Sequence, residues 1–265
     1  MPGSITQVKD YLNSLETAAL AYSGGVDSTL LLCLLKESGI QKLLAVTSVA
    51  ETYSSGSLKK ARKFTRKYGV KHEVIETDEL DDDNFTRNDK NRCYYCKEEL
   101  FTSIRKFALK RGIENVLEAS HIADTYDYRP GIRAAGELGV ISPFIKFKWD
   151  KNKIREVSEE LGVPGYDRPS TVCAASRVPY GTKIDSQNLD MIKQGEKFLK
   201  SLGFKICRVR SDGTTARIEV LKEKVENLTG IREKVIKRFK KLGFTYIALD
   251  LEGYRSGKMN RVIDK

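Results

Sequence analysis

The stretch Ala18-Ala19-Leu20-Ala21-Tyr22-Ser23-Gly24-Gly25-Val26-Asp27-Ser28 decides how the chain begins to fold. Its first five residues are apolar and predict a buried strand, and the apolar period of residues 27–37 predicts a helix directly after the glycine pair. Glycine lets backbone N–H groups approach an anion at the positive end of a helix. The stretch therefore predicts a phosphate site at a strand-to-helix turn. A plain helix start, capped by Ser23 and Asp27, is the alternative.

The alternation of strands and helices continues beyond this turn. Apolar runs typical of strands alternate with helical periods as far as residue 119. This order predicts an α/β fold, in which a parallel Rossmann-like sheet is wrapped by helices and binds ligands at the carboxyl ends of its strands. The predicted strands are 18–22, 42–49, 71–76 and 115–119, and the predicted helices are 5–15, 27–37, 58–68 and 97–109.

The pattern changes in the last third of the chain. Regions 77–92 and 162–185 show no regular period and predict long irregular loops. The elements after them predict a small α+β domain. We therefore expect a nucleotide-binding domain over residues 1–180 and a smaller substrate-binding or assembly domain over residues 181–265. The elements predicted for the second domain are helix 186–202, strands 205–210 and 215–220, helix 223–242 and strand 245–250.

The composition favours a folded protein that binds anions. The chain has 265 residues, 40% of them hydrophobic and 31% charged, which is enough for a substantial core. Its formal net charge of +11 favours polyanionic partners such as nucleotides, phosphates or RNA. Because Lys and Arg are spread among Glu and Asp, a solvated basic surface is the alternative. No apolar run is long enough to cross a bilayer and no secretion signal is recognisable, so we expect a cytoplasmic protein without membrane association.

Three of the five cysteines lie near the predicted ligand edge of the sheet. Cys93 and Cys96 form a Cys-x-x-Cys motif at a helix start, and Cys173 lies in a loop rich in Pro and Gly. An odd number of cysteines without an export signal argues for reduced thiols or metal ligation. A zinc site completed by His121 is one alternative, since structural zinc normally takes four ligands.

An iron-sulfur cluster is the other use of these three thiolates. Three thiolates on a [4Fe-4S] cluster leave one iron without a protein ligand, and that iron can hold a hydrosulfide. Such a bound sulfur is a nucleophile at neutral pH, and Arg92, Lys97 and Arg177 could stabilise the negative charge. The other two cysteines, Cys33 and Cys207, lie in apolar elements and are predicted to be packing residues.

Arginines of the second domain predict an anion clamp. With the period of two of a strand, Arg208 and Arg210 point to one face, and Arg217 and Glu219 share a face of the next strand. If the two strands pair, three guanidinium groups come together and could bind a phosphate or a carboxylate. An exposed polar sheet face with its own partner charges is the alternative. Arg129 follows a strand of the first domain, and this position favours the ligand cleft.

The phosphate turn resembles a known nucleotide-binding loop. Residues 23–28, placed after an apolar strand, are similar to the PP-loop of the ATP pyrophosphatases, which split ATP between its α and β phosphates and transfer AMP to a substrate oxygen. The turn has neither Walker spacing nor the glycine spacing of dinucleotide-binding proteins. The resemblance implies ATP and Mg²⁺ as ligands, with Asp27 as a catalytic residue. The nucleotide site that it implies comprises Ala21, Tyr22, Ser23, Gly24, Gly25, Asp27, Ser28, Thr47 and Ser48.

Further segments make the chain similar to the LarE sulfur-insertase family over nearly its whole length. LarE enzymes convert pyridinium-3,5-biscarboxylic acid mononucleotide to its thiocarboxylate form, the organic part of the nickel-pincer nucleotide cofactor. The resemblance implies an ATP-dependent sulfur transferase that uses this small pyridinium nucleotide and sulfide or another sulfur donor. We expect a homo-oligomer and no nucleic-acid partner. The segments that carry the resemblance are 92–97, 118–124, 127–131, 173–181, 208–210, 216–220 and 250–257.

The LarE family uses two sources of sulfur. One class sacrifices a single cysteine, whose position matches Cys173, and is left with dehydroalanine. The other class carries three cysteines around a [4Fe-4S] cluster, which Cys93, Cys96 and Cys173 match. Two rival functions remain: a tRNA thiolation enzyme, which also combines a PP-loop with three cysteines, and a protein that binds a nucleotide without catalysis. The sequence has no dedicated RNA-binding module, which argues against the first rival.

Overall fold

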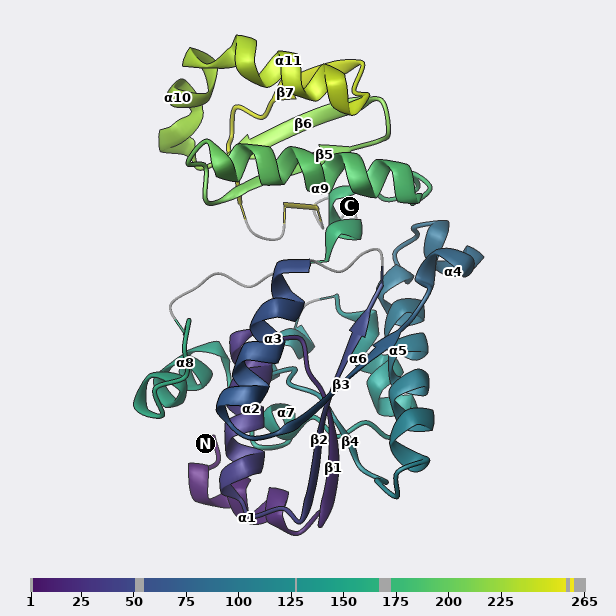
Figure 1. Cartoon of the computed structure of the whole chain (residues 1–265), viewed down its shortest axis with the longest axis vertical. Helices are drawn as coiled ribbons and strands as arrows, with labels where there is room; N and C mark the ends of the chain where they lie inside the picture. Colours follow the sequence, from purple (N-terminus) through teal and green to yellow (C-terminus); the bar gives the residue numbers. More distant parts are fainter. Residues whose placement is uncertain (1, 51–54, 127, 167–172, 256–257, 260–265) are drawn as a thin grey trace. The chain divides into compact units, whose positions relative to one another are not determined.

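The computed structural model describes residues 2–50, 55–126, 128–166, 173–255 and 258–259 (Figure 1). It is an α/β protein with a parallel sheet and a second, smaller sheet near the C-terminus, as predicted. Among the described residues, no helix has both the length and the apolar character that are needed to cross a membrane.

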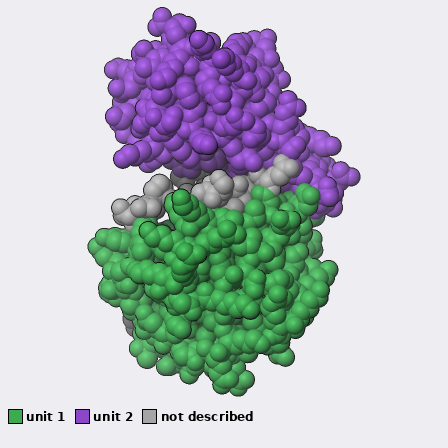
Figure 2. Space-filling model, in the orientation of Figure 1, with its two compact units in different colours: residues 1–79, 93–171 green, residues 80–92, 172–265 purple. Residues whose placement is uncertain are grey.

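The chain packs as two compact units, which Figure 2 colours separately. From the sequence we expected a boundary near residue 180, whereas the packing also assigns the stretch 80–92 to the second unit. Asn88 explains this assignment, because its buried side chain donates hydrogen bonds to the carbonyl oxygens of Pro179 (2.7 Å) and Thr182 (2.8 Å). Unit 1 comprises Met1–Glu79 and Cys93–Thr171, and unit 2 comprises Leu80–Arg92 and Val172–Lys265.

A parallel sheet of four strands forms the centre of unit 1, in the order β3-β2-β1-β4. The central strand β1 pairs with β2 in the register Ala19 to Leu44, and with β4 in the register Ala19 to Val116. Because all four strands run in one direction, their carboxyl ends meet at one edge, where ligands bind in such sheets. The strands are β1 (Thr17–Ala21), β2 (Lys42–Val49), β3 (Lys71–Glu76) and β4 (Val116–Leu117).

Helices cover both faces of this sheet (Figure 1). Successive residues of β1 point to opposite faces. Leu20 packs in one apolar cluster with Leu12 and Leu30, and Ala19 packs in another with Phe101. The apolar run of β1 is therefore buried on both sides, which is typical of a central parallel strand. The helices of unit 1 are α1 (Ile5–Asn13), α2 (Val26–Glu37), α3 (Ser55–Lys67), α5 (Arg92–Leu109), α6 (Pro130–Glu137), α7 (Pro143–Lys146) and α8 (Lys151–Glu160).

The prediction of an irregular loop over residues 77–92 is wrong. This stretch contains the short helices η1 (Glu79–Asp81) and α4 (Asp83–Thr86), and α5 begins at Arg92 rather than at Lys97. Asp82 and Asp89 accept hydrogen bonds from the backbone N–H groups of Asn84 and Asn91, and Asp82 thereby caps α4. Such turns and caps need no apolar period, so the pattern of apolar residues does not detect them.

Three further helices of unit 1 were not predicted from the sequence. Pro130 and Pro143 stand in the first turns of α6 and α7, where proline is tolerated because its missing N–H has no helical partner. Asp150 caps α8 by accepting a hydrogen bond of 2.8 Å from the Lys153 N–H. The start of α8 places Lys151 beside the phosphate turn.

Unit 2 contains a three-stranded sheet in the order β5-β6-β7, in which β5 and β6 are antiparallel and β6 and β7 are parallel. Helices α9 and α11 pack closely, since a Cβ at Gly195 would lie only 3.2 Å from the Phe239 ring. The single helix predicted over 223–242 is wrong, because the chain leaves helical geometry at Ile231. The elements are η3 (Ala174–Arg177), α9 (Ser186–Ser201), β5 (Cys207–Ser211), β6 (Thr215–Val220), η4 (Lys222–Lys224), α10 (Val225–Gly230), α11 (Arg232–Leu242) and β7 (Tyr246–Leu249).

Candidate functional site

The phosphate turn joins β1 to α2. Gly24 has a φ of +71°, a left-handed conformation that favours glycine, and Gly25 is the extended N-cap of α2, with no side chain capping the helix there. The Gly25 N–H donates to Ser23 Oγ (3.2 Å), which lies 3.0 Å from Ser28 Oγ. A Cβ at Gly25 would lie 3.3 Å from Ser23 Oγ and crowd the turn. Ser23 thus accepts a backbone N–H, as the capping alternative expects, whereas the N-cap residue Gly25 has no side chain to cap α2, and the turn fits a phosphate group.

Asp27 is paired with a lysine that the sequence analysis missed. Nζ of Lys151 donates a hydrogen bond to Oδ1 of Asp27. Each of the two side chains is 26% exposed, so a ligand can reach both. Lys151 is 124 positions away from Asp27 and belongs to no recognisable motif. This ammonium group can pair with Asp27 or with the phosphates of a nucleotide.

Hydroxyl groups at the carboxyl end of β2 are engaged within the sheet. Thr47 is 1% exposed, donates a hydrogen bond of 2.6 Å to the Tyr22 carbonyl, and lies 2.8 Å from His72 Nε2. Ser48 Oγ lies 2.6 Å from Thr77 Oγ1. Burial lowers the pKa of His72, which favours its neutral ring. These contacts fix the strand ends beside the predicted nucleotide site.

Arg129 is held by a buried carboxylate. Its Nη2 lies 3.1 Å from Oδ1 of Asp124, which is 8% exposed. The other carboxylate oxygen accepts a hydrogen bond of 3.1 Å from the His121 N–H. The Arg129 side chain is 54% exposed, so a ligand can reach it. Asp127, which the resemblance also included, lies outside the described residues.

Cys93 and Cys96 are three residues apart in α5 and therefore share one face of the helix. Cys93 is exposed and Cys96 is half-buried. The Cys96 thiol donates a hydrogen bond to Oε1 of Glu79, with 3.7 Å between sulfur and oxygen. Burial raises the pKa of this carboxyl group to about 7. Glu79 is the second contact residue that the sequence analysis missed, because it lay in a stretch that was predicted to be a loop.

Arginine side chains hold the backbone that follows Cys173 in unit 2. The guanidinium groups of three arginines donate to carbonyl oxygens of this short loop. Arg92 and Arg177 had been predicted to stabilise the negatively charged sulfur site, and Arg210 to bind a phosphate or a carboxylate. The bonds run from Arg177 to Cys173 (2.9 Å), from Arg92 to Ala175 (3.1 Å) and from Arg210 to Ser176 (2.8 Å). These arginines therefore shape the loop that presents the exposed Cys173 thiol.

The register of β5 and β6 confirms that the predicted clamp arginines share a face. Arg210 lies opposite Arg217, and Arg208 lies opposite Glu219. Glu219 is fully buried and accepts two hydrogen bonds of 3.0 Å from Arg210. Arg217 lies 3.6 Å from Asp250, and its side chain is 51% exposed. The face thus carries its own counter-charges, and Arg217 is the guanidinium that stays open to a ligand.

The two remaining cysteines are buried, as predicted. Cys33 belongs to the apolar cluster around α2, and Cys207 lies on β5 with its thiol 3.8 Å from the Glu196 carbonyl oxygen. Burial raises the pKa of both thiols, that of Cys207 to about 11. Neutral buried thiols of this kind are packing residues.

The donor set fits an iron-sulfur cluster in kind, because all five cysteines are free thiols. Cys93 and Cys96 belong to unit 1, and Cys173 belongs to unit 2. Within the part of the chain that the structure describes, no group of three or more His, Cys, Asp or Glu side chains forms a metal site. His121, the ligand of the zinc alternative, has its ring 3.4 Å from Asp124.

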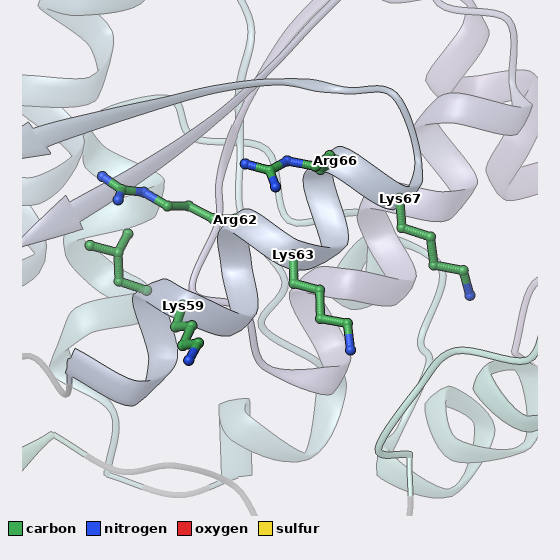
Figure 3. Close-up of a pocket in the computed structure, with 6 residues that line it drawn as sticks. Lys59, Arg62, Lys63, Arg66 and Lys67 are labelled. Carbon is green, nitrogen blue, oxygen red and sulfur yellow. The ribbon is translucent and has the colours of Figure 1, made fainter.

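A basic hollow of about 720 Å³ runs along α3 (Figure 3). All of its lining residues come from this one helix, so the hollow is an open surface rather than an enclosed site. The phosphate turn does not line it. It is a concentration of positive charge that could attract a polyanion. The lining residues are Leu58, Lys59, Arg62, Lys63, Arg66 and Lys67.

Comparisons with known proteins cover both units. No family model matches the chain. The chain is 32% identical to the pyridinium-3,5-bisthiocarboxylic acid mononucleotide synthase of Lactiplantibacillus plantarum, over 96% of this chain and 92% of that protein. It is 36% identical to an uncharacterized protein of Synechocystis over 100% of both chains. An uncharacterized protein of Methanocaldococcus jannaschii is 32% identical, over 89% of this chain and 90% of its own length.

Proposed function

The chain belongs to the LarE family, and from this premise we propose that it is an ATP-dependent sulfur transferase. It adenylates a carboxylate of pyridinium-3,5-biscarboxylic acid mononucleotide and replaces one carboxylate oxygen with sulfur, in the synthesis of the nickel-pincer nucleotide. Similarity to the Lactiplantibacillus plantarum synthase over 96% of the chain carries this proposal. The phosphate turn at Gly24 and Gly25 supports it independently.

Adenylation requires a cradle for the phosphates of ATP. The backbone N–H groups at the start of α2 would hold the leaving pyrophosphate, and Asp27 would hold the accompanying Mg²⁺, which would stabilise the negative charge that develops there. Lys151 then pairs with phosphate oxygens in place of Asp27. A substrate carboxylate oxygen attacks the α-phosphorus of ATP, an acyl adenylate forms, and pyrophosphate leaves.

Sulfur transfer requires a nucleophilic sulfur at the activated carbon. We assign Cys93, Cys96 and Cys173 as ligands of a [4Fe-4S] cluster, which supplies an open iron for hydrosulfide when it is bound. Hydrosulfide adds to the acyl carbon and AMP leaves with the bonding electron pair. The thioacid that remains releases its proton to water and becomes the thiocarboxylate. Within unit 2, the guanidinium group of Arg92 bonds the carbonyl oxygen of Ala175, two residues after Cys173, and so helps to hold the loop of that cysteine. Free thiols also suit a reducing compartment such as the cytoplasm.

Substrate binding is assigned to the exposed arginines. Arg129 and Arg217 keep more than half of their side chains exposed while a carboxylate holds each one in place. Guanidinium groups fixed in this way suit the phosphate and carboxylate groups of the substrate. Arg177, Arg208 and Arg210 complete the predicted set, and two of them, Arg177 and Arg210, hold the Cys173 loop within unit 2.

Oxygen-free purification followed by iron and sulfide analysis tests the source of sulfur. We expect about four irons and four sulfides per chain, the composition of one [4Fe-4S] cluster. Replacing Cys93, Cys96 or Cys173 by Ala should remove most of the iron and abolish sulfur transfer. Cys33→Ala and Cys207→Ala are the matched controls, and they should keep the cluster while lowering stability.

Intact-protein mass spectrometry after turnover tests the sacrificial alternative. That alternative requires one turnover per chain, dehydroalanine at residue 173, and dispensable Cys93 and Cys96. An iron-free protein that behaves in this way would contradict the cluster assignment while leaving the sulfur transferase proposal intact. A protein that releases no pyrophosphate with the substrate would contradict the adenylation itself.

A tRNA thiolation enzyme is the second candidate, and the basic surface along α3 is the observation that favours it. In that case, purified tRNA should bind with an affinity that falls steeply with salt, and should gain sulfur on incubation with ATP and sulfide. Replacing Lys63 and Arg66 by Glu should abolish that binding. If tRNA gains no sulfur while the pyridinium nucleotide does, this candidate is excluded.

A further inference from the structure

The buried carboxyl group of Glu79 lies next to Cys96 and takes no part in the proposed reaction. Glu79 opens η1, in the segment between β3 and α5, and is only 6% exposed. Its Oε2 is buried and accepts no hydrogen bond from any described residue. A buried carboxyl oxygen without a partner is costly, so its retention calls for an explanation.

An ion pair with a cationic side chain does not explain why the carboxyl group of Glu79 is buried. The described residues include no Lys, Arg or His within ion-pair distance of its carboxyl group. The charges that act on it most are those of Glu99 and Asp78, which are negative. The contact that the structure provides is the Cys96 thiol, 3.7 Å from Oε1.

The backbone around Glu79 is tied to the helix that carries Cys96. The N–H of Asp78 donates a hydrogen bond of 3.1 Å to Oε1 of Glu99, which lies one helical turn after Cys96 in α5. This bond and the thiol contact therefore both join the Asp78–Glu79 segment to α5. The carboxyl group is thus held against one thiol of the pair, whereas Cys93 stays exposed.

We infer that Glu79 is a positioning residue for Cys96: its carboxyl group accepts the hydrogen bond of the Cys96 thiol and so places this sulfur, before the cluster binds, where it can become a ligand. The ligand role of Cys96 rests on the proposed function, but the contact itself does not. Hydrogen bonds to ligand sulfurs orient them and tune the reduction potential of iron-sulfur clusters. Glu79 acts through Cys96 and needs no contact with the substrate.

Variants of Glu79 in the reconstituted enzyme provide the first test. Glu79→Ala should bind iron about tenfold more weakly than the wild type, the lower end of the effect of removing a group that supports a metal ligand. Glu79→Gln keeps an oxygen that can accept from the Cys96 thiol and should recover most of the iron, but with a higher midpoint potential, because the amide N–H can donate to the ligand sulfur where a carboxylate cannot. Glu98→Gln is the matched control, since Glu98 is exposed in the same helix and contacts Tyr94 instead.

Unchanged iron affinity and midpoint potential in Glu79→Ala would overturn the inference. Thermal unfolding and ATP binding should be measured beside them. If Glu79→Ala shows neither cooperative thermal unfolding nor ATP binding, it is misfolded and Glu79→Gln is measured instead. A midpoint potential of Glu79→Gln equal to that of the wild type would also overturn the inference.

Alkylation of the iron-free protein separates this inference from the proposed function. Iodoacetamide labelling followed by peptide mapping compares Cys96 with Cys93 in the same chain. Glu79→Ala should raise labelling of Cys96 relative to Cys93 by roughly threefold or more, because the thiol is no longer held beside a carboxylate. A ratio equal to that of the wild type and of Glu98→Gln would mean that Glu79 does not hold Cys96. A wild-type protein that binds no cluster would contradict the cluster assignment, while this ratio would still decide the contact.

Discussion

The guanidinium group of Arg177 donates a hydrogen bond of 2.9 Å to the carbonyl oxygen of Cys173, four residues earlier in the chain. The same side chain donates to both carboxylate oxygens of Glu196, at 2.8 and 3.3 Å. Arg177 is therefore fixed by a buried carboxylate and in turn fixes the backbone at the cysteine. The geometry of the Cys173 loop depends on this ion pair, so damage to the pair should affect both stability and sulfur transfer.

The free energy of unfolding at acid pH should depend on the ion pair between Glu196 and Arg177. Burial alone would raise the pKa of Glu196, but the hydrogen bonds and charge of Arg177 hold it below its ordinary value of 4.5. The stabilisation is thus present above pH 4.5 and is lost as the pH falls below that value. Glu196→Gln should cost about 3 kcal/mol at neutral pH, because Arg177 loses its counter-charge, and should flatten the acid dependence.

Urea unfolding across the acid range checks this prediction. Glu156→Gln is the control, because Glu156 pairs with Lys153 on an exposed surface and should change stability by less than about 0.5 kcal/mol. An acid dependence in Glu196→Gln as steep as that of the wild type would show that another group is responsible.

Gly25→Val should abolish pyrophosphate release. A Cβ at this position already lies 3.3 Å from Ser23 Oγ, and a branched side chain would fill the space of the phosphates. Gly136→Ala is the control, since a Cβ there meets nothing within 4 Å, and it should leave the rate unchanged. The test is the rate of pyrophosphate release in the presence of the substrate. A normal rate in Gly25→Val would refute the phosphate site.

Lys151→Met should weaken ATP binding by about 1.5–3 kcal/mol, the range for hydrogen bonds that involve charged groups. The pairing with Asp27 places this ammonium group at the phosphate turn. Lys153→Met, two residues further along α8, removes only an exposed pair with Glu156 and should leave ATP affinity unchanged. Calorimetric titration with ATP and Mg²⁺ measures the affinity of both variants. An ATP affinity of Lys151→Met equal to that of the wild type would place Lys151 outside the nucleotide site.

Arg210→Ala and Arg217→Ala should have different effects. Loss of Arg210 leaves the buried Glu219 without its two closest hydrogen bonds and frees the Ser176 carbonyl, so stability should fall by about 3 kcal/mol. Loss of the exposed Arg217 should weaken binding of the pyridinium nucleotide by about 1.5–3 kcal/mol with little effect on stability. Urea unfolding and substrate titrations test the two variants. A loss of substrate binding in Arg210→Ala and a loss of stability in Arg217→Ala would reverse the roles assigned to these arginines.

The sequence predicted the local architecture of the chain well. Strands 42–49, 71–76 and 215–220 have the predicted bounds, and the phosphate turn lies at the predicted junction of strand and helix. The face shared by Arg210 and Arg217 also followed from the period of two. These features depend on residues that are close in the chain, where apolar period, glycine and strand alternation act directly on the backbone.

The tertiary structure alone decided which partners these residues have. The pairing of Lys151 with Asp27, the contact of Cys96 with Glu79, and the return of residues 80–92 to the second unit through Asn88 all join segments that no periodicity connects. The sequence placed an arginine on each strand face, but it could not reveal that the buried Glu219 occupies Arg210. Such contacts depend on how helices and strands pack in three dimensions, and the free energy of that packing is shared among residues far apart in the chain.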